Sequence, residues 1–246
     1  MDILYVVGTG SKWNDNELRY SLRSIAMYGR NIDRVFIVGH RPDFVSDIVH
    51  YIPCDDPYVR KHKNILHKVK TAINKSDISN HFLISSDDHF YRREVDFDNL
   101  PVYYIFEQIR HNLTSEEAKS HYNLSLQDKY NMLSRYGFSV YQTNPHCNTH
   151  FRTDLFCRNQ YLFDEAMRME YGGEMNCIMG NLMIANGAQP VAYKDSKLEL
   201  EKWKDERRRA ERLEGVECFS ISDKSLQWGM ADILKQLYPN KCKYER

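Results

Sequence analysis

The sequence predicts an α/β fold with a mainly parallel central sheet and a helical, elaborated C-terminal half. In the first part of the chain, short apolar runs alternate with stretches whose apolar residues recur at helical spacing. Such alternation is typical of parallel strands joined by right-handed helical crossovers. No tract rich in Pro, Gly or Ser divides the 246 residues, so we expect one domain over 1–246.

The elements of the first part follow from these patterns. Ile3–Val7 is a continuous apolar run that ends at Gly8, which predicts a buried strand. Leu18, Leu22 and Ile25 then recur at helical spacing, which predicts an amphipathic helix. By the same criteria the predicted elements are a strand at 3–7, a helix at 16–25, strands at 35–38 and 49–52, a helix at 61–74 and a strand at 82–85.

The second part of the chain has a more helical pattern. Its methionines are interpreted as flexible side chains that fill the core. A charged segment with interspersed acidic and basic residues is interpreted as a solvated helix. The predicted elements are a strand at 100–106, a helix at 115–135, a strand at 138–141, helical structure over 155–185, a charged helix at 197–214, a strand at 216–221 and a helix at 226–237.

The composition is that of a soluble, enzyme-sized domain. Lys plus Arg and Asp plus Glu both total 34, so we expect no nucleic-acid partner, although a local basic groove stays an open alternative. No apolar run is long enough to span a membrane, and the first residues lack a signal-peptide pattern, which predicts a cytoplasmic protein. The six cysteines form no close pair, which favours reduced thiols over a zinc site or a disulfide scaffold.

Two adjacent carboxylates follow the predicted strand at 82–85. Asp87 and Asp88 come where that strand ends, and open α/β sheets form their ligand sites at the carboxyl ends of their strands. Adjacent carboxylates resist ionising together unless a cation neutralises them, and their oxygens suit Mg²⁺ or Mn²⁺ bridging to phosphates. The pattern therefore predicts a metal site at Asp88 and Asp87, with an ordinary strand-end turn as the alternative.

Glycines after the first strand form a loop at the same expected edge of the sheet. Gly8, Thr9 and Gly10 lack the spacing of a phosphate loop or a dinucleotide fingerprint. This argues against nucleoside triphosphate hydrolysis and dinucleotide oxidoreduction. A tight strand-to-helix turn explains both glycines equally well, and the loop could also hold a base or ribose through its backbone.

Three segments of the sequence resemble the successive blocks of the Stealth-type proteins. They are 17–25, 34–38 and 80–90, and the last contains the paired aspartates. Stealth-type proteins are transferases of bacterial surface polysaccharide synthesis that use nucleotide-sugar donors. The segment 63–68 is similar to a smaller glycosyltransferase-like branch of this group, and short C-terminal matches extend the resemblance over nearly the whole chain. The resemblance implies a GT-A-like (Rossmann-like) core.

Basic residues near this edge are candidates for the donor's phosphates. Arg19 and Arg23 lie one turn apart on the predicted helix, and a guanidinium suits bidentate phosphate contact. Surface ion pairs with acidic neighbours such as Glu17 are the alternative for these arginines. Lys63 and Lys68 are further candidates for phosphate contact.

Three side chains are candidates for positioning or deprotonating an acceptor hydroxyl. His89 directly follows the paired aspartates, and Asp223 follows the predicted strand at 216–221. His146 lies in a polar loop after the predicted strand at 138–141, in the region that resembles the histidine-bearing block of the Stealth-type proteins. The sequence does not rank the three.

Together these observations predict a metal-dependent glycosyltransferase that moves a sugar from a nucleotide-sugar donor to a hydroxyl acceptor such as a glycan. Residues 1–100 are expected to form the donor-binding core and residues 101–246 the acceptor side. Transfer of a hexose-1-phosphate from the same type of donor is one alternative. A non-catalytic module that binds a nucleotide sugar or a glycan is the other.

Overall fold

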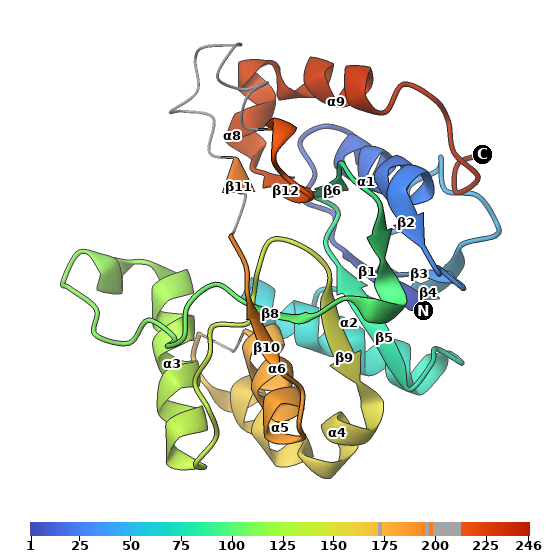
Figure 1. Ribbon diagram of the computed structural model, residues 1–246. Helices are drawn as coiled ribbons and strands as arrows, with labels where there is room; N and C mark the ends of the chain where they lie inside the picture. The colour runs from blue at the N-terminus through green and yellow to red at the C-terminus, as the bar shows by residue number, and fades with distance from the viewer. Residues whose placement is uncertain (172–173, 195–196, 199–212) are drawn as a thin grey trace.

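A five-stranded sheet lies at the centre of the described part of the chain, which comprises residues 1–171, 174–194, 197–198 and 213–246 of a computed structural model (Figure 1). Four strands are parallel, and the last is antiparallel to its neighbour. This confirms the predicted mainly parallel sheet. Across the sheet the order is β4 (His50–Pro53), β3 (Val35–Gly39), β1 (Asp2–Val7), β5 (His81–Ser85) and β9 (Thr149–Arg152).

The register brings the carboxyl ends of the parallel strands to one edge. Val7 at the end of β1 pairs with Gly39 at the end of β3. On the other side, Ile84 of β5 pairs with Thr149, which begins the antiparallel strand β9. The loops after β1, β3, β4 and β5, and the loop before β9, therefore meet at this edge, where ligand sites form in open α/β sheets.

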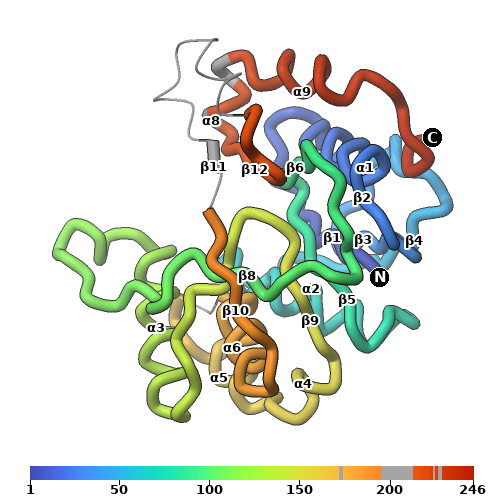
Figure 2. Tube along the Cα trace, in the orientation of Figure 1, coloured from blue at the N-terminus to red at the C-terminus, as the bar shows by residue number. Residues whose placement is uncertain are grey.

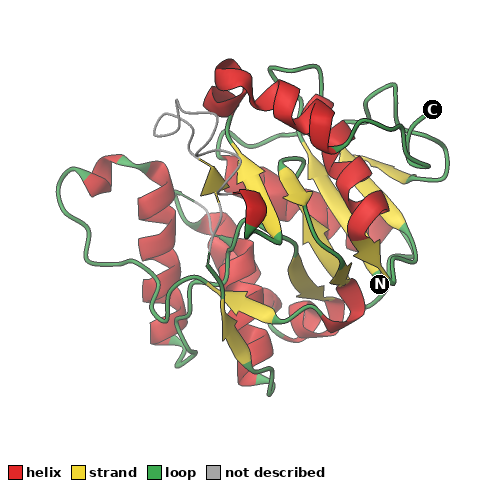
Figure 3. Cartoon of the chain, turned by 45° about the horizontal axis from the view of Figure 1, so that its top comes forward, coloured by secondary structure: helices red, strands yellow, loops and turns green. Residues whose placement is uncertain are grey.

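Different helices cover the two faces of the sheet (Figure 3). Successive side chains of a strand point to opposite faces, so Tyr5 of β1 packs in one core cluster with Leu22 of α1 (Asn16–Tyr28). Leu4 packs in another cluster with α2 (Lys61–Lys75). Because β4 is parallel to β3, the helix α2 that follows it begins at the carboxyl edge of the sheet.

The helical structure predicted over 155–185 forms, as separate helices with short breaks between them. Asn159 leaves the helical conformation and caps two neighbouring helices, and Met169 is extended. The helices of this half are α3 (His121–Arg135), α4 (Thr153–Arg158), α5 (Gln160–Arg168) and α6 (Met175–Ala185). Residues of α4, α5 and α6 join the same core cluster as α2.

The predicted strand at 138–141 does not form. The side chain of Asn181 on α6 accepts a hydrogen bond from the Tyr141 backbone N–H (3.0 Å) and donates one to the Tyr141 carbonyl (2.8 Å). These backbone groups are the ones that a neighbouring strand would need. A helix side chain therefore replaces the sheet partner.

Smaller sheets complete the described chain. Of the charged helix predicted at 197–214, the pair Lys197–Leu198 is a strand and 199–212 lie outside the described residues. The smaller sheets are β6 (His89–Tyr91) with β12 (Cys218–Ile221) and β11 (Lys197–Leu198), β8 (Val102–Tyr104) with β10 (Pro190–Ala192), and β2 (Gly29–Arg30) with β7 (Val95–Asp96).

Short helical segments connect these sheets, and the C-terminal tail returns to α1 (Figure 2). Val45 forms an antiparallel bridge with Glu245. Within the described residues, no helix combines the length and apolar composition that a membrane crossing needs. The remaining helical segments are the 3₁₀ turns at Phe97–Asn99 and Glu117–Lys119, α8 (Asp223–Ser225), a π-helical stretch at Leu226–Met230 and α9 (Ala231–Leu237).

Candidate functional site

The paired aspartates lie at the carboxyl edge of the sheet, in the turn between β5 and β6. β5 is buried up to Ser85, and Asp87 and Asp88 are half-buried in the turn that follows. The turn is held because the Ser21 hydroxyl on α1 donates a hydrogen bond to the His89 carbonyl (2.6 Å). The side chains of a rigid strand-to-strand turn are well placed to hold a ligand.

The electrostatics of this turn favour a cation. Burial, together with the neighbouring Asp88 carboxylate, raises the pKa of Asp87 to about 7. Burial also raises the pKa of Glu17, at the start of α1, which accepts a hydrogen bond from Ser11. A divalent cation would relieve this repulsion. Among the residues that the structure describes, no group of three His, Cys, Asp or Glu side chains could hold a metal. A metal at Asp87 and Asp88 would take further oxygens from water or from a substrate.

The loop after β1 is open to solvent beside this turn. Thr9 and Gly10 are exposed, and a Cβ placed on Gly10 would meet no atom within 4 Å. Ser11 fixes the end of the loop, because its hydroxyl accepts from the backbone N–H groups of Trp13 (3.1 Å) and Asp15 (2.9 Å). The loop therefore presents free backbone at its tip and is anchored where it enters α1.

Lys68 lies beneath this loop and is engaged by the protein. Its ammonium donates to the Val7 carbonyl (2.9 Å) and pairs with Asp56 (2.6 Å), and the side chain is buried. The cation thereby satisfies the carbonyl that ends β1. Lys63 is half-exposed in the first turn of α2, which begins at the same edge.

The two arginines of α1 face the C-terminal tail. Arg23 pairs bidentately with Glu245 (2.7 and 2.9 Å) and donates to the Tyr238 carbonyl (3.0 Å). Arg19 lies 3.7 Å from the same carboxylate and stacks over the ring of Phe44. These contacts favour the ion-pair alternative for Arg23, although the partner is Glu245 and not a residue near the start of α1.

The three predicted acid–base candidates lie on different elements near the edge. His89 is buried on β6, with its Nε2 3.9 Å from the Asp88 carboxylate. The carbonyl of His146 accepts from the Cys218 thiol (3.6 Å), which places its loop against β12. Asp223 begins α8 and lies 3.4 Å from the Lys12 ammonium, with both side chains exposed.

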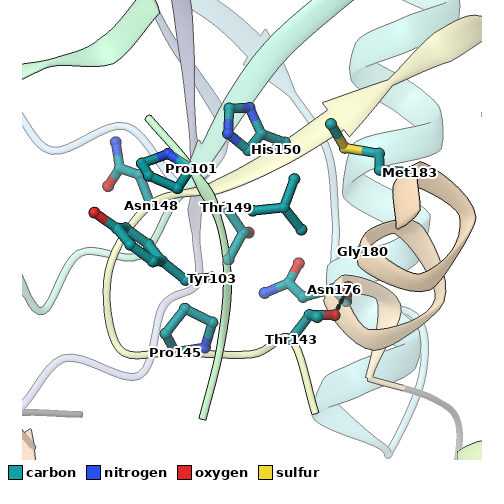
Figure 4. Close-up of a pocket in the computed structure, with 11 residues that line it drawn as sticks. Pro101, Tyr103, Thr143, Pro145, Asn148, Thr149, His150, Asn176, Gly180 and Met183 are labelled. Carbon is teal, nitrogen blue, oxygen red and sulfur yellow. Dashed lines mark hydrogen bonds between the residues drawn. The ribbon is translucent and has the colours of Figure 1, made fainter. Parts of the chain in front are cut away.

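A small pocket lies between β8, the loop before β9 and α6, and sequence reasoning missed it (Figure 4). Thr149 and Asn176 direct their polar atoms into the space. Among the described residues, both polar atoms of the Asn148 amide, the Thr149 hydroxyl and the Asn176 amide oxygen are buried without a hydrogen-bond partner. Buried polar groups are normally paired, and the cavity of about 10 Å³ has room for about one water, so these atoms indicate a site for a water molecule or a single polar group of a ligand.

None of the described side chains that line the pocket is charged at neutral pH. Burial lowers the pKa of His150 to about 4, so its imidazole is neutral. Burial raises the pKa of Tyr103 to about 12, so its phenol is neutral as well. The pocket therefore suits an uncharged ligand with hydroxyl or amide groups. The sequence shows a polar loop at 142–150, but histidines are the stronger signal in such a loop and Asn148 has no pattern that singles it out.

Comparisons with known proteins identify the fold. No family model and no curated protein matches the chain. Among solved structures, the chain is similar to the galactosyltransferase LgtC in complex with donor and acceptor sugar analogs, with 10% sequence identity and a TM-score of 0.50. The match covers 97% of this chain and 95% of that chain. The chain has the fold of that protein.

A second solved structure gives the same result. An active-site mutant of LgtC matches with 10% identity and a TM-score of 0.50, over 96% of this chain and 95% of the other. Both matches confirm the predicted GT-A-like α/β fold with its mainly parallel sheet. The resemblance to Stealth-type proteins stays a prediction.

Proposed function

We propose that the protein is a metal-dependent glycosyltransferase that moves a sugar from a nucleotide-sugar donor to a hydroxyl acceptor. One observation carries the proposal: an acidic turn, an open glycine loop and an uncharged polar pocket share one edge of the sheet. A nucleotide sugar has matching parts, since its diphosphate is charged and its sugar is neutral. The similarity to a galactosyltransferase fold supports the proposal.

Asp88 and Asp87 would hold Mg²⁺ or Mn²⁺. Their fit to a cation rests on burial and on the neighbouring Asp88 carboxylate, which together raise the pKa of Asp87. When bound, the metal supplies charge stabilisation to the diphosphate that departs. Carboxylate oxygens are suitable ligands for these ions, which usually retain substrate phosphates in their coordination.

The donor's other parts would be held by neighbouring elements. The loop of Gly8, Thr9 and Gly10, exposed at Thr9 and Gly10, would hold the base or ribose through its backbone, and Lys63 is placed to reach phosphates from the start of α2. Arg19 stays a candidate for phosphate contact. We assign Arg23 and Lys68 a structural role beside the site, because Arg23 already donates to Glu245 and Lys68 already donates to the Val7 carbonyl.

The uncharged pocket, with a volume of about 10 Å³, would receive a single hydroxyl group of the donor's sugar. Asn148 offers a donor and an acceptor, and the Thr149 hydroxyl offers both. Residues 1–100 would then bind the nucleotide and metal, and residues 101–246 would complete the sugar pocket and the acceptor side of a single domain. The predicted acid–base candidates His89, His146 and Asp223 lie near the same edge.

A panel of nucleotide sugars tests the proposal. Incubation with Mn²⁺ and simple glycosides as acceptors should release nucleoside diphosphate, and the release should be lost in Asp88→Asn. Asp43→Asn is the matched control, because Asp43 is an exposed carboxylate on the loop after β3. A protein that neither binds nor turns over any donor would contradict the proposal.

The same experiment separates the rival functions. Release of nucleoside monophosphate would indicate the Stealth-like transfer of a hexose-1-phosphate. Donor binding without any release would indicate a binding module for nucleotide sugars or glycans. We further expect the protein in the cytoplasm, which cell fractionation checks.

A further inference from the structure

A histidine and a glutamate form a hydrogen-bonded pair at the carboxyl edge of the sheet. His62 is in the first turn of α2, and Glu174 is the residue that precedes α6. Their Nδ1 and Oε1 atoms are 2.9 Å apart, and the side chains are 21% and 12% exposed. A carboxylate can only accept, so Nδ1 of His62 donates. The lone pair of the neutral imidazole is therefore on Nε2.

Glu174 is ionised in this pair. Burial acts to raise the pKa of Glu174, but the hydrogen bond from His62, with smaller contributions from the surroundings, leaves that pKa below its usual value. Lys61 and a hydrogen bond from Asn144 act in the same direction. An ionised carboxylate on Nδ1 orients the ring and stabilises the imidazolium that forms when Nε2 takes a proton.

The pair lies at the start of α2, at the same carboxyl edge of the sheet as the acidic turn. Lys61, next to His62, is close enough to influence the charge of both Asp87 and Glu174. Asn144 bonds Glu174 and is flanked by two pocket residues, and Asn176 also lines the pocket. A proton acceptor here is beside the place where a donor sugar and its diphosphate would meet.

We propose that His62 is the general base for the acceptor hydroxyl and that Glu174 is the positioning residue that orients it. This inference rests on the proposed glycosyl transfer. The acceptor oxygen forms a bond to the anomeric carbon as the bond from that carbon to the diphosphate oxygen breaks. The leaving diphosphate keeps the electron pair of the broken bond, and the hydroxyl proton moves to Nε2 of His62.

The surroundings distinguish His62 from the candidates that the sequence suggested. His89 is only 7% exposed, and Asp223 pairs with Lys12. His62 combines a carboxylate partner on one ring nitrogen with a partly exposed ring. The charged and titratable groups around the pair are Tyr122, whose ring is 6.5 Å from that of His62, and Lys61, Lys129 and Cys177, which interact electrostatically with Glu174. Arg60, at the start of α2, contacts His121 and Glu170.

Substitution of His62 tests the inference against a matched control. In the assay with Mn²⁺, the best nucleotide sugar of the panel and the best simple glycoside, His62→Gln should lower kcat about 10²–10⁴-fold. Donor affinity and melting temperature should stay near those of the wild type. His67→Gln on the same helix, where His67 contacts Tyr58, should keep full activity. Imidazole added to His62→Ala should restore part of the rate.

Glu174→Gln tests the pair through the pH profile of kcat/KM, which would not shift if His62 and Glu174 were only structural. Without the carboxylate the imidazole holds its proton less tightly, so the acid limb of the kcat/KM profile should shift to lower pH as the rate falls. This variant decides the matter if His62→Gln does not fold. Wild-type transfer with His62→Gln, or an unmoved acid limb in Glu174→Gln, would overturn the inference. Failure of the wild type to turn over any donor would instead overturn the proposed function.

Discussion

The two regions that meet at the carboxyl edge differ in charge and in how the chain builds them. The turn with Asp87 and Asp88 is a contiguous acidic motif at the end of one strand. The pocket around Asn148 and Asn176 is neutral and is assembled from a loop, a strand and a helix. Charge suits metal and diphosphate, and neutrality suits a sugar, so the difference indicates a division of binding between the two regions.

The largest expected effect comes from removing the charge at the acidic turn. Asp88→Ala should weaken Mn²⁺-dependent binding of a nucleotide sugar more than about 100-fold, since even indirect changes at metal sites cost about 10–100-fold. The side chain is half-exposed, so the melting temperature should stay unchanged. Calorimetry with and without Mn²⁺ measures both affinities, and Asp43→Ala serves as the control. A wild-type affinity in Asp88→Ala would show that no metal binds at this turn.

A second prediction tests whether Arg23 belongs to the charged region that would bind the donor. Arg23→Ala should lower the free energy of unfolding by about 3 kcal/mol, because the buried Glu245 carboxylate loses its bidentate partner and keeps only Arg19 at 3.7 Å and the Cys242 backbone N–H. Donor affinity should not change. Arg158→Ala, which breaks an exposed pair with Asp154, should cost less than about 1 kcal/mol. Urea unfolding and calorimetry test this. An unchanged stability with weaker donor binding would instead show that Arg23 contacts the phosphates of the donor.

A third prediction tests whether His150, which lines the pocket, is neutral. Burial lowers the pKa of His150 to about 4, while the unfolded chain titrates near 6.5. The unfolded state therefore binds the proton first, and stability should fall by up to about 3 kcal/mol as pH decreases from 6.5 to 4. His81, which hydrogen-bonds Nδ1 of His150 (3.0 Å), also has a lowered pKa and acts in the same direction.

The measurement for His150 is urea unfolding at several pH values. His150→Gln retains a donor for the Leu100 carbonyl, which His150 Nε2 contacts at 2.6 Å. This variant should lose most of the pH dependence between 6.5 and 4. If its stability falls with pH as steeply as that of the wild type, the histidine is not the buried neutral group that the pocket requires.

The smallest effect is expected for the pocket amide. Asn148→Ala removes buried polar atoms that have no partner among the described residues, so stability should stay unchanged or rise by up to about 1 kcal/mol. The KM for the donor should rise about 10-fold, the worth of one hydrogen bond of about 1.4 kcal/mol. Asn186→Ala, at an exposed helix end, should leave KM unchanged. A lower melting temperature with an unchanged KM would show a structural amide.

The local patterns of the sequence determined the parallel strands, the helices α1 and α2 and the acidic turn after β5. Each depends on neighbouring residues: a buried apolar run, a helical spacing, and carboxylates where a strand ends. A pattern within one strand or a few helical turns is enough to predict each of these features. The sequence alone therefore predicted that Asp87 and Asp88 lie at the carboxyl edge of the sheet.

Only the tertiary structure decided the contacts between distant segments. Arg23 and Glu245 are 222 residues apart in sequence, His62 and Glu174 lie at the starts of two different helices, and Asn181 replaces the sheet partner of Tyr141. Each contact forms because folding of the core brings two surfaces together, and the polar groups that become buried there must find partners. No local pattern names those partners, because the energy of a buried polar contact depends on what the rest of the chain places opposite it.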